Sequence, residues 1–188
     1  ICNTPYKKNN IKKFLFVGRL DRVKRIEIQL KALSLLNSSS YIFDIYCKIV
    51  DQAYYLEILS LVKKLKIENN INFIFGEINK YKIYSASDFL ILTSSFEGFP
   101  TVLLEAVSYN VYPISFNIKC GPNEIIVNED IGKLVEEPIN NKHEAIYKAI
   151  KKCWNFKINK KEAKKLLYKY DIDKNIIFFL NYLYDKKN

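Results

Sequence analysis

The chain is poor in the residues that build metal and redox sites. Its 188 residues include one histidine, His143, and four cysteines that stand far apart, namely Cys2, Cys47, Cys120 and Cys153. No two cysteines have the close spacing of a zinc-ligand pair or a redox dithiol, so we expect reduced thiols and no metal site. Methionine is absent even at position 1, and we therefore expect the chain to begin inside a longer protein.

Long apolar runs are missing as well. The sequence has no stretch of 18 or more apolar residues, which predicts no membrane-spanning helix, and the polar residues 1–10 do not resemble a signal peptide. With reduced thiols, these features predict a cytoplasmic protein, with a peripheral position on the inner face of the cell membrane as a second option. The content of 49% hydrophobic and 27% charged residues is that of a folded domain.

The formal net charge of +10 is unevenly distributed. Residues 1–141 contain 17 basic and 15 acidic residues, whereas residues 142–188 contain 13 lysines and five acidic residues. A basic C-terminal part is typical of proteins that bind an anionic membrane surface or nucleic acid, and a solvated lysine-rich surface explains it equally well. Because the aromatic residues fall mostly inside predicted strands, we expect no nucleic-acid partner.

Strand patterns alternate with helical patterns along the chain. We predict strands at 13–17, 41–50, 71–75, 89–92, 112–116 and 133–135, and helices at 23–36, 52–65, 80–86, 101–108, 141–154, 160–169 and 173–184. This order predicts an α/β fold with a Rossmann-like, doubly wound parallel sheet of about six strands, helices on both faces and further C-terminal helices. Ligands of such sheets bind beyond the carboxyl ends of the strands.

The loop after the first predicted strand is basic, and two of its residues, Arg19 and Lys24, could reach into the same crevice. We expect Gly18 to turn the chain off the strand, Arg19 to lie at the strand's carboxyl end and Lys24 to lie one turn into the next helix. A guanidinium and an ammonium group suit a diphosphate, although a solvated turn explains the same residues. The three-glycine fingerprint of dinucleotide sites is absent, which argues against an NAD site.

The loop after the fourth predicted strand leads into a helix whose first turn faces the same edge of the sheet. Gly98 and Pro100 end the strand pattern, and the helix is predicted to begin near Thr101. Backbone amides around Phe99, Thr101 and Val102 would then be free at the helix N-terminus, an environment that favours phosphate.

Two glutamates frame this helix start. Glu97 lies on the loop, and Glu105 follows about one turn inside the helix. An acidic residue near a helix N-terminus is often a surface charge favoured by the helix dipole. Glu105, however, stands among apolar neighbours, and a carboxylate in that setting could accept two hydrogen bonds from a ribose diol.

The two loops together resemble the C-terminal, donor-binding domain of retaining glycosyltransferases with the B-type fold. The resemblance is to the group 1, family 4-like glycosyltransferases, which include glycogen synthase-like and lipopolysaccharide or capsule enzymes, and it covers residues 3–184. It implies that residues 1–188 form a single nucleotide-sugar-binding domain. Residues 1–10 would be the interdomain linker, and residues 173–185 a terminal helix that packs toward a separate N-terminal domain.

The resemblance also assigns residues to parts of a nucleotide diphosphate sugar. It implies that Glu97 is catalytic and faces the donor sugar, and that Glu105 holds the ribose hydroxyls. The remaining contacts that it implies are Arg19, Lys24, Thr101 and Val102 at the diphosphate, Gly98, Phe99 and Pro100 at the sugar, and Phe75, Gly76 and Glu77 at the nucleobase.

The sequence departs from the family pattern at two positions. Arg25 follows Lys24, where the family usually has glycine, and Asn110 stands near the end of the next helix, where the family often has Ala-x-Gly-x-Pro. Asparagine can adopt the left-handed conformation that glycine would supply. The segments 121–125 and 132–135 also resemble the family.

The resemblance implies transfer of a sugar, with retention, from a nucleotide diphosphate sugar to a glycan or lipid-linked acceptor in surface polysaccharide synthesis. UDP is the expected nucleotide. No metal or cofactor is expected, because basic side chains and helix amides would offset the charge of the leaving diphosphate. The acceptor site would lie in the separate N-terminal domain, so we expect this chain to be inactive alone. The alternatives are a nucleotide-sugar epimerase of the same fold and a basic nucleic-acid-binding module.

Overall fold

Six parallel strands form one sheet in the computed structural model of the protein, which describes residues 11–76 and 79–171. The order across the sheet is β3-β2-β1-β4-β5-β6. The strands are β1 (Lys12–Leu20), β2 (Tyr41–Ile49), β3 (Ile71–Ile74), β4 (Phe89–Leu92), β5 (Tyr112–Phe116) and β6 (Lys133–Val135). The chain builds outward from β1 to β3 and then returns to place β4 on the other side of β1. This reversal is where doubly wound sheets bind ligands.

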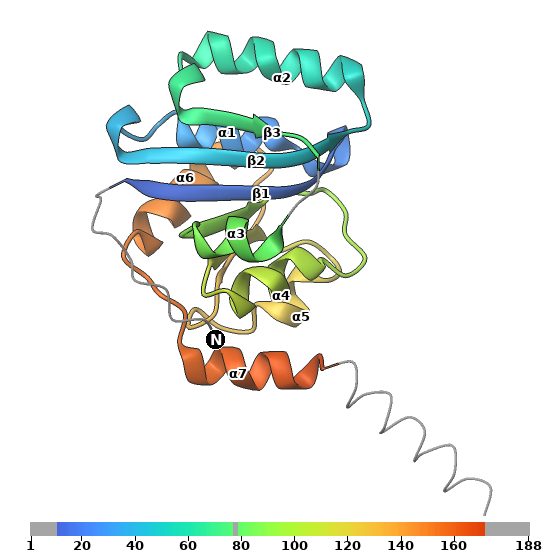
Figure 1. Ribbon diagram of the computed structural model, residues 1–188, viewed down its shortest axis with the longest axis vertical. Helices are drawn as coiled ribbons and strands as arrows, with labels where there is room; N and C mark the ends of the chain where they lie inside the picture. Colours follow the sequence, from blue (N-terminus) through green and yellow to red (C-terminus); the bar gives the residue numbers. More distant parts are fainter. Residues whose placement is uncertain (1–10, 77–78, 172–188) are drawn as a thin grey trace, which may run out of the picture.

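Helices connect the strands and cover both faces of the sheet. Figure 1 shows α3 in front of the sheet and α1 and α6 behind it. The α-helices are α1 (Ile26–Leu33), α2 (Gln52–Leu65), α3 (Lys80–Ser85), α4 (Thr101–Ser108), α5 (Pro122–Ile125), α6 (Lys142–Cys153) and α7 (Lys160–Lys169). Short 3-10 turns form η1 (Arg22–Lys24), η2 (Ser38–Ser40) and η3 (Glu68–Asn70). The predicted Rossmann-like α/β fold is confirmed.

The central strands are apolar on both faces because helices shield both faces from water. Every residue of β4 and of β5 is buried. On β1, the ring of Phe14 stacks on Phe89 of β4 with centroids 5.2 Å apart. Burying an aromatic side chain of this size stabilises a fold by roughly 2–3 kcal/mol. The core therefore holds β1 firmly beside β4, and these two strands carry the two candidate loops.

The first strand was predicted to end at Gly18, but it continues to Leu20. Gly18 lies opposite Cys47 in the parallel ladder, and the pairing between β1 and β2 continues to Leu20 opposite Ile49. Leu20 is fully buried. Because β2 offers nine residues to pair with and Leu20 enters the core, the ladder outlasts the glycine. Arg19 therefore lies on the strand itself.

The predicted helix at 23–36 is also wrong in its first turn. The carboxylate of Asp21 accepts hydrogen bonds from the amides of Val23 and Lys24, which caps the short turn η1. Arg25 then adopts left-handed backbone angles, φ 48° and ψ 47°, and a right-handed helix cannot pass through that conformation. The α-helix begins only at Ile26, after this kink.

The first helix ends at Leu33, three residues before its predicted end. The other predicted elements match within one residue at either end, while α5 and the 3-10 turns were not predicted. Asn110 has φ 62°, the left-handed conformation expected of it. The predictions for residues 1–10, for Glu77 and for the helix at 173–185 lie outside the described residues. Within 11–76 and 79–171, none of the helices combines the length and apolar character needed to cross a bilayer.

Candidate functional site

Lys24 and Glu97 meet beyond the carboxyl ends of β1 and β4. The Lys24 Nζ lies 2.6 Å from a carboxylate oxygen of Glu97, although 73 positions separate them in the chain. Their side chains are only 17% and 12% exposed, respectively. The structure therefore brings together the predicted diphosphate ligand and the predicted catalytic carboxylate, in a partly desolvated pair.

Backbone hydrogen bonds join the two loops that carry this pair. The amide of Ser95 donates to the carbonyl of Val23 at 2.8 Å. The hydroxyl of Thr93, at the end of β4, lies 3.1 Å from the carbonyl oxygens of both Lys24 and Arg25. The turn η1 is thereby attached to the end of β4, and these contacts help to set the position of Lys24 relative to Glu97.

Arg19 lies at the carboxyl end of β1, as predicted, but its side chain points to solvent more than that of Lys24 does. The side chain is 64% exposed and forms an ion pair with Asp21 at 3.2 Å. Because Asp21 also caps η1, this pair links the arginine to the turn that carries Lys24. An exposed guanidinium at this edge is accessible to an anionic ligand.

The start of α4 differs in one respect from the prediction of free amides. Thr101 is the first helical residue, and its amide donates to the carbonyl of Phe99 at 2.9 Å, so this amide is not free. Pro100 occupies the N-cap position without a side-chain cap. The contacts predicted for Thr101, Val102 and their neighbours on the donor remain predictions.

Gly121, just before α5, supports the Gly98–Pro100 part of this loop. A Cβ atom at Gly121 would lie 2.5 Å from the Cδ of Pro100 and 3.0 Å from the carbonyl oxygen of Gly98. The backbone of Gly121 has φ 93°, which glycine adopts readily and other residues rarely adopt. Glycine at this position therefore allows two chain segments to approach each other beneath the candidate site.

Glu105 on α4 is held from α3. One carboxylate oxygen accepts a hydrogen bond from Lys80 Nζ at 2.7 Å, and the other accepts one from the Tyr84 hydroxyl at 2.8 Å. Tyr84 is fully buried, and its ring stacks on Tyr109 with centroids 5.4 Å apart. Burial, together with the hydrogen bond to Glu105, raises the pKa of the Tyr84 phenol, so that it stays protonated as a donor. The predicted ribose ligand is thus oriented by two residues that the sequence analysis did not identify.

The described part of the predicted nucleobase loop is exposed. Phe75 and Gly76 follow β3, the outermost strand on its side of the sheet, and Phe75 makes an edge contact with Tyr55 of α2. The side chain of Phe75 is 51% exposed. The chain then leads into α3, whose Lys80 and Tyr84 reach Glu105, so this loop connects to the site through α3.

Arg25 makes more polar contacts around the site than any residue predicted for it. Its Nε donates to the carbonyl of Thr93 at 2.7 Å, and its Nη2 donates to that of Ser94 at 3.0 Å. The same guanidinium binds both oxygens of Glu137, at 2.6 and 2.8 Å, and lies over the ring of Phe116. The signal in the sequence was the basic residue at a position where the family usually has glycine.

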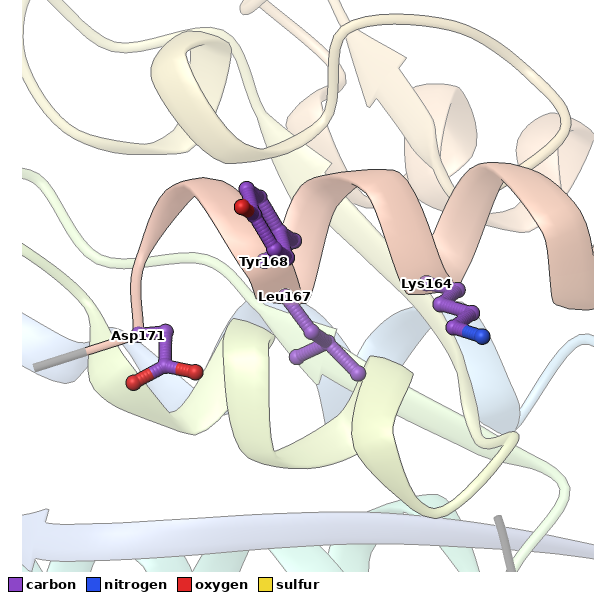
Figure 2. Close-up of a pocket in the computed structure, with 4 residues that line it drawn as sticks. All are labelled: Lys164, Leu167, Tyr168 and Asp171. Carbon is purple, nitrogen blue, oxygen red and sulfur yellow. The ribbon is translucent and has the colours of Figure 1, made fainter. Parts of the chain in front are cut away.

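A hollow beside α7 is separate from the predicted donor residues. It is lined by Lys164, Leu167, Tyr168 and Asp171, which Figure 2 shows along one helix and the turn after it. The end of α7 nevertheless reaches the candidate loop, because Tyr170 packs on Phe99 with ring centroids 5.2 Å apart. Among residues 11–76 and 79–171, no group of three or more histidine, cysteine, aspartate and glutamate side chains is arranged to hold a metal ion.

A comparison with known protein families identifies the family of this chain. The family model described as "Glycosyl transferases group 1" matches residues 4–165, which include all of the candidate site described above. The chain belongs to this family. The pair of Lys24 and Glu97 lies within the matched residues, and so does Glu105 on α4.

Individual relatives agree with this assignment. The chain is 29% identical over 123 residues to the N-acetylgalactosamine-N,N'-diacetylbacillosaminyl-diphospho-undecaprenol 4-alpha-N-acetylgalactosaminyltransferase of Campylobacter jejuni, a match that covers 65% of this chain and 32% of that protein. The chain thus spans about a third of the length of this curated relative.

Solved structures share the fold of this group 1 domain. A glycosyltransferase from Rickettsia africae superposes with a TM-score of 0.81 at 23% identity, over 93% of this chain and 48% of that one. The Anabaena protein HepE, solved in complex with UDP and glucose, superposes with a TM-score of 0.67 at 21% identity, over 78% of this chain and 39% of that one. At these identities the similarity establishes the fold alone. It extends over about half of the Rickettsia chain and over less than half of the Anabaena chain.

Proposed function

We propose that this chain is the donor-binding half of a retaining glycosyltransferase that uses a nucleotide diphosphate sugar. The observation that carries the proposal is the meeting of Lys24 with Glu97 at the carboxyl edge of β1 and β4, with Glu105 held by Lys80 and Tyr84 on the helix that follows. A cation for the diphosphate, a carboxylate for the sugar and a carboxylate for the ribose then lie along one edge of the sheet.

UDP is the nucleotide that we propose for the donor. The support is the complex of the Anabaena protein with UDP and glucose, which has the same fold as this chain. Phe75 and Gly76, at the end of β3, would lie beside the base. Glu105 would accept hydrogen bonds from the ribose hydroxyls in place of its bond to Lys80, the exposed one of its two partners.

In the proposed reaction, the bond between the anomeric carbon and the diphosphate breaks, the acceptor oxygen bonds to the same face of that carbon, and the proton of the acceptor hydroxyl passes to the leaving diphosphate. Negative charge develops on the leaving diphosphate, and Lys24, Arg19 and the amide of Val102 at the start of α4 would offset it. Losing one such cation raises the barrier by roughly 2–4 kcal/mol. Glu97, beside Lys24, would orient the sugar and stabilise positive charge at its anomeric carbon.

The acceptor site belongs, in this proposal, to an N-terminal domain that completes the enzyme. The support is that the chain spans about a third of the Campylobacter relative and about half of the Rickettsia structure. The name of the Campylobacter relative contains diphospho-undecaprenol, a lipid carrier. We therefore propose a glycan or lipid-linked acceptor for the whole protein, as in the synthesis of lipopolysaccharide or another surface polysaccharide.

A lipid-linked acceptor would lie at a membrane surface, and the lysine-rich helices α6 and α7 would bind the enzyme to that surface. The lysines of α7 are exposed, and so are those at the end of α6 (Lys148, Lys151, Lys152, Lys160, Lys161, Lys164, Lys165 and Lys169). Each basic residue near an anionic bilayer contributes about 1 kcal/mol to binding. We propose peripheral binding of a cytoplasmic enzyme to the inner face of the cell membrane. Co-sedimentation with phosphatidylglycerol vesicles at low salt tests it, and unbound protein under those conditions contradicts it.

Calorimetric titration of the chain with UDP, GDP and ADP tests the donor site. We expect UDP to bind, and Lys24→Ala, Arg19→Ala and Glu105→Ala each to weaken it. The matched controls are Lys64→Ala on α2 and Glu68→Ala on η3, because both residues are exposed. If all five variants bind like the parent chain, the site is wrongly assigned.

Product analysis with the whole enzyme then separates transfer from epimerisation. A glycosylated acceptor with the donor's anomeric configuration supports the proposal, whereas a free epimerised sugar points to the epimerase alternative. We expect no turnover by the 188-residue chain alone. A turnover rate equal to that of the whole enzyme would contradict the assignment of the acceptor site to another domain.

A further inference from the structure

The arginine at position 25 occupies a backbone conformation that is unfavourable for it. Its left-handed φ of 48° is reached easily by glycine and at a cost in free energy by residues with a Cβ atom. Strain of this kind persists where the surrounding contacts compensate for it. At Arg25 these compensating contacts are made by its own side chain.

Those contacts reach three different strands of the sheet. The guanidinium donates to the carbonyls of Thr93 and Ser94, which follow β4, and to both oxygens of Glu137, which follows β6. Its plane lies over Phe116 at the end of β5, 5.5 Å from the ring centroid. One side chain thus ties the end of η1 to the ends of three adjacent strands.

The arginine is unavailable as a ligand for the diphosphate, because its charge is already matched. Its side chain is only 15% exposed, and Glu137 binds it in the two-pronged arrangement that is strongest for an arginine and a carboxylate. Glu137 also pairs with Lys142 of α6. Arg25 can therefore affect the site only through other residues.

The segment that Arg25 holds is the one that carries Glu97. Thr93 and Ser94 are both buried, so their carbonyls have no access to bulk water and depend on partners within the protein. At the next residue, the amide of Ser95 donates to the Val23 carbonyl of η1. Lys24 lies next to Arg25 in the chain, and Glu97 lies three residues beyond Ser94.

We infer that Arg25 and Glu137 are positioning residues: together they hold the turn that carries Lys24 against the loop that carries Glu97. The pair acts through Lys24 and Glu97 and makes no contact with the donor. This inference rests on the proposed function for its effect on nucleotide binding, whereas the joining of the two loops can be measured without any ligand.

Two substitutions, Arg25→Gly and Arg25→Lys, distinguish the effect of the Arg25 side chain from the effect of its backbone conformation. Glycine relieves the left-handed strain and removes the guanidinium, whereas Arg25→Lys keeps the charge and loses the two-pronged contact. Glu137→Gln keeps the shape of the partner and removes its charge. Lys142→Ala is the matched control, because Lys142 binds the same carboxylate and does not contact the loop.

Hydrogen exchange at the Ser95 amide reports the joining of the two loops directly. We expect Arg25→Gly and Arg25→Lys to speed this exchange at least about tenfold relative to amides of β2, since a charge-assisted hydrogen bond contributes about that factor. Lys142→Ala should leave it unchanged. Unchanged exchange in Arg25→Gly, or a uniform increase over the whole sheet, would overturn the inference.

Nucleotide binding gives the second readout, a test of coupling. We expect Arg25→Gly to weaken UDP binding in the parent chain and to have almost no further effect when Lys24→Ala is already present. Equal weakening in both backgrounds contradicts action through Lys24. If the parent chain binds no nucleotide, the proposed function fails, while the exchange at Ser95 still decides whether Arg25 joins the loops.

Discussion

Lys24 on η1 and Glu97 after β4 form an ion pair with an N–O distance of 2.6 Å. The pair lies beyond the carboxyl ends of β1 and β4, where the strand order of the sheet reverses. The pair is largely buried, so solvent screens it less than it screens a surface pair. A diphosphate that binds Lys24 must either share the ammonium group with Glu97 or displace the carboxylate. The contact therefore couples the proposed phosphate and sugar parts of the site, and it leads to the first prediction.

Replacing Glu97 with glutamine should strengthen the binding of UDP and abolish sugar transfer. The amide removes a negative charge near the proposed diphosphate position and frees Lys24, so we expect a severalfold gain in UDP affinity. Calorimetry on the chain measures the affinity, and the whole enzyme provides the transfer rate. Glu68→Gln, an exposed residue on η3, is the control. Weaker UDP binding in Glu97→Gln would show that Glu97 supports the nucleotide in another way.

The proposed ribose contact predicts a specific loss of discrimination. The parent chain should bind UDP more tightly than 2'-deoxy-UDP, because Glu105 would accept a hydrogen bond from the 2'-hydroxyl. A hydrogen bond to a charged group contributes about 1.5–3 kcal/mol, which corresponds to roughly ten- to hundredfold in affinity. In Glu105→Ala we expect the two nucleotides to bind alike. If the parent and the variant prefer UDP over 2'-deoxy-UDP equally, the assignment of Glu105 to the ribose is wrong.

Tyr84 should matter for the same carboxylate. In Tyr84→Phe one oxygen of Glu105 loses its buried donor, so we expect the free energy of unfolding to fall by about 1–3 kcal/mol. The preference for UDP over 2'-deoxy-UDP should also shrink, because the carboxylate is less well oriented. Tyr168→Phe on α7 serves as the control, since Tyr168 is exposed. Urea denaturation and calorimetry provide the two measurements, and a Tyr84→Phe chain with unchanged stability and preference contradicts the prediction.

Gly121 and Gly76 offer a matched pair of substitutions. Both have positive φ, 93° and 105°, so alanine is strained at either position. A Cβ at Gly121 would also overlap Pro100, whereas a Cβ at Gly76 would meet nothing within 4 Å. Since overpacking costs roughly 1–3 kcal/mol, we expect Gly121→Ala to destabilise the chain by about that much more than Gly76→Ala. Urea denaturation of the two variants measures the difference, and equal losses would mean that the loop at Pro100 moves freely.

The pair between Arg25 and Glu137 should make stability depend on pH in the acid range. The hydrogen bonds from Arg25 lower the pKa of the Glu137 carboxyl from 4.5 to about 2. A lowered folded-state pKa stabilises the fold above the unfolded value, and this stabilisation is lost as the pH falls from about 5 to about 2.

We therefore expect the difference in unfolding free energy between the parent chain and Glu137→Gln to shrink over this range by about 2 kcal/mol. Urea titrations at several pH values measure it. Glu68→Gln, a change at an exposed carboxylate, is the control. A flat difference for Glu137→Gln would show that Arg25 gives this carboxylate no special stability.

The sequence alone determined the order of the elements and led to the prediction of four charged residues for the candidate site. Hydrophobic periodicity is a local property, so the wholly apolar β4 and the amphipathic helices could be recognised without coordinates. Arg19, Lys24 and Glu97 could be named because they closely follow predicted strands, and Glu105 because it lies about one turn inside the helix after the fourth strand. Glycine, proline and asparagine marked turns, and Asn110 adopts the conformation expected of it.

The tertiary structure decided how these residues meet. Placing β4 beside β1 depends on long-range packing in the core, and only that placement brings Lys24 and Glu97 together. The roles of Tyr84 and Lys80 at Glu105 depend on α3 packing beside α4, which no local pattern encodes. The kink at Arg25 defeated the helix prediction because its cost is offset by contacts with β4, β5 and β6. Local preference determined the elements, whereas contacts between distant segments determined the site.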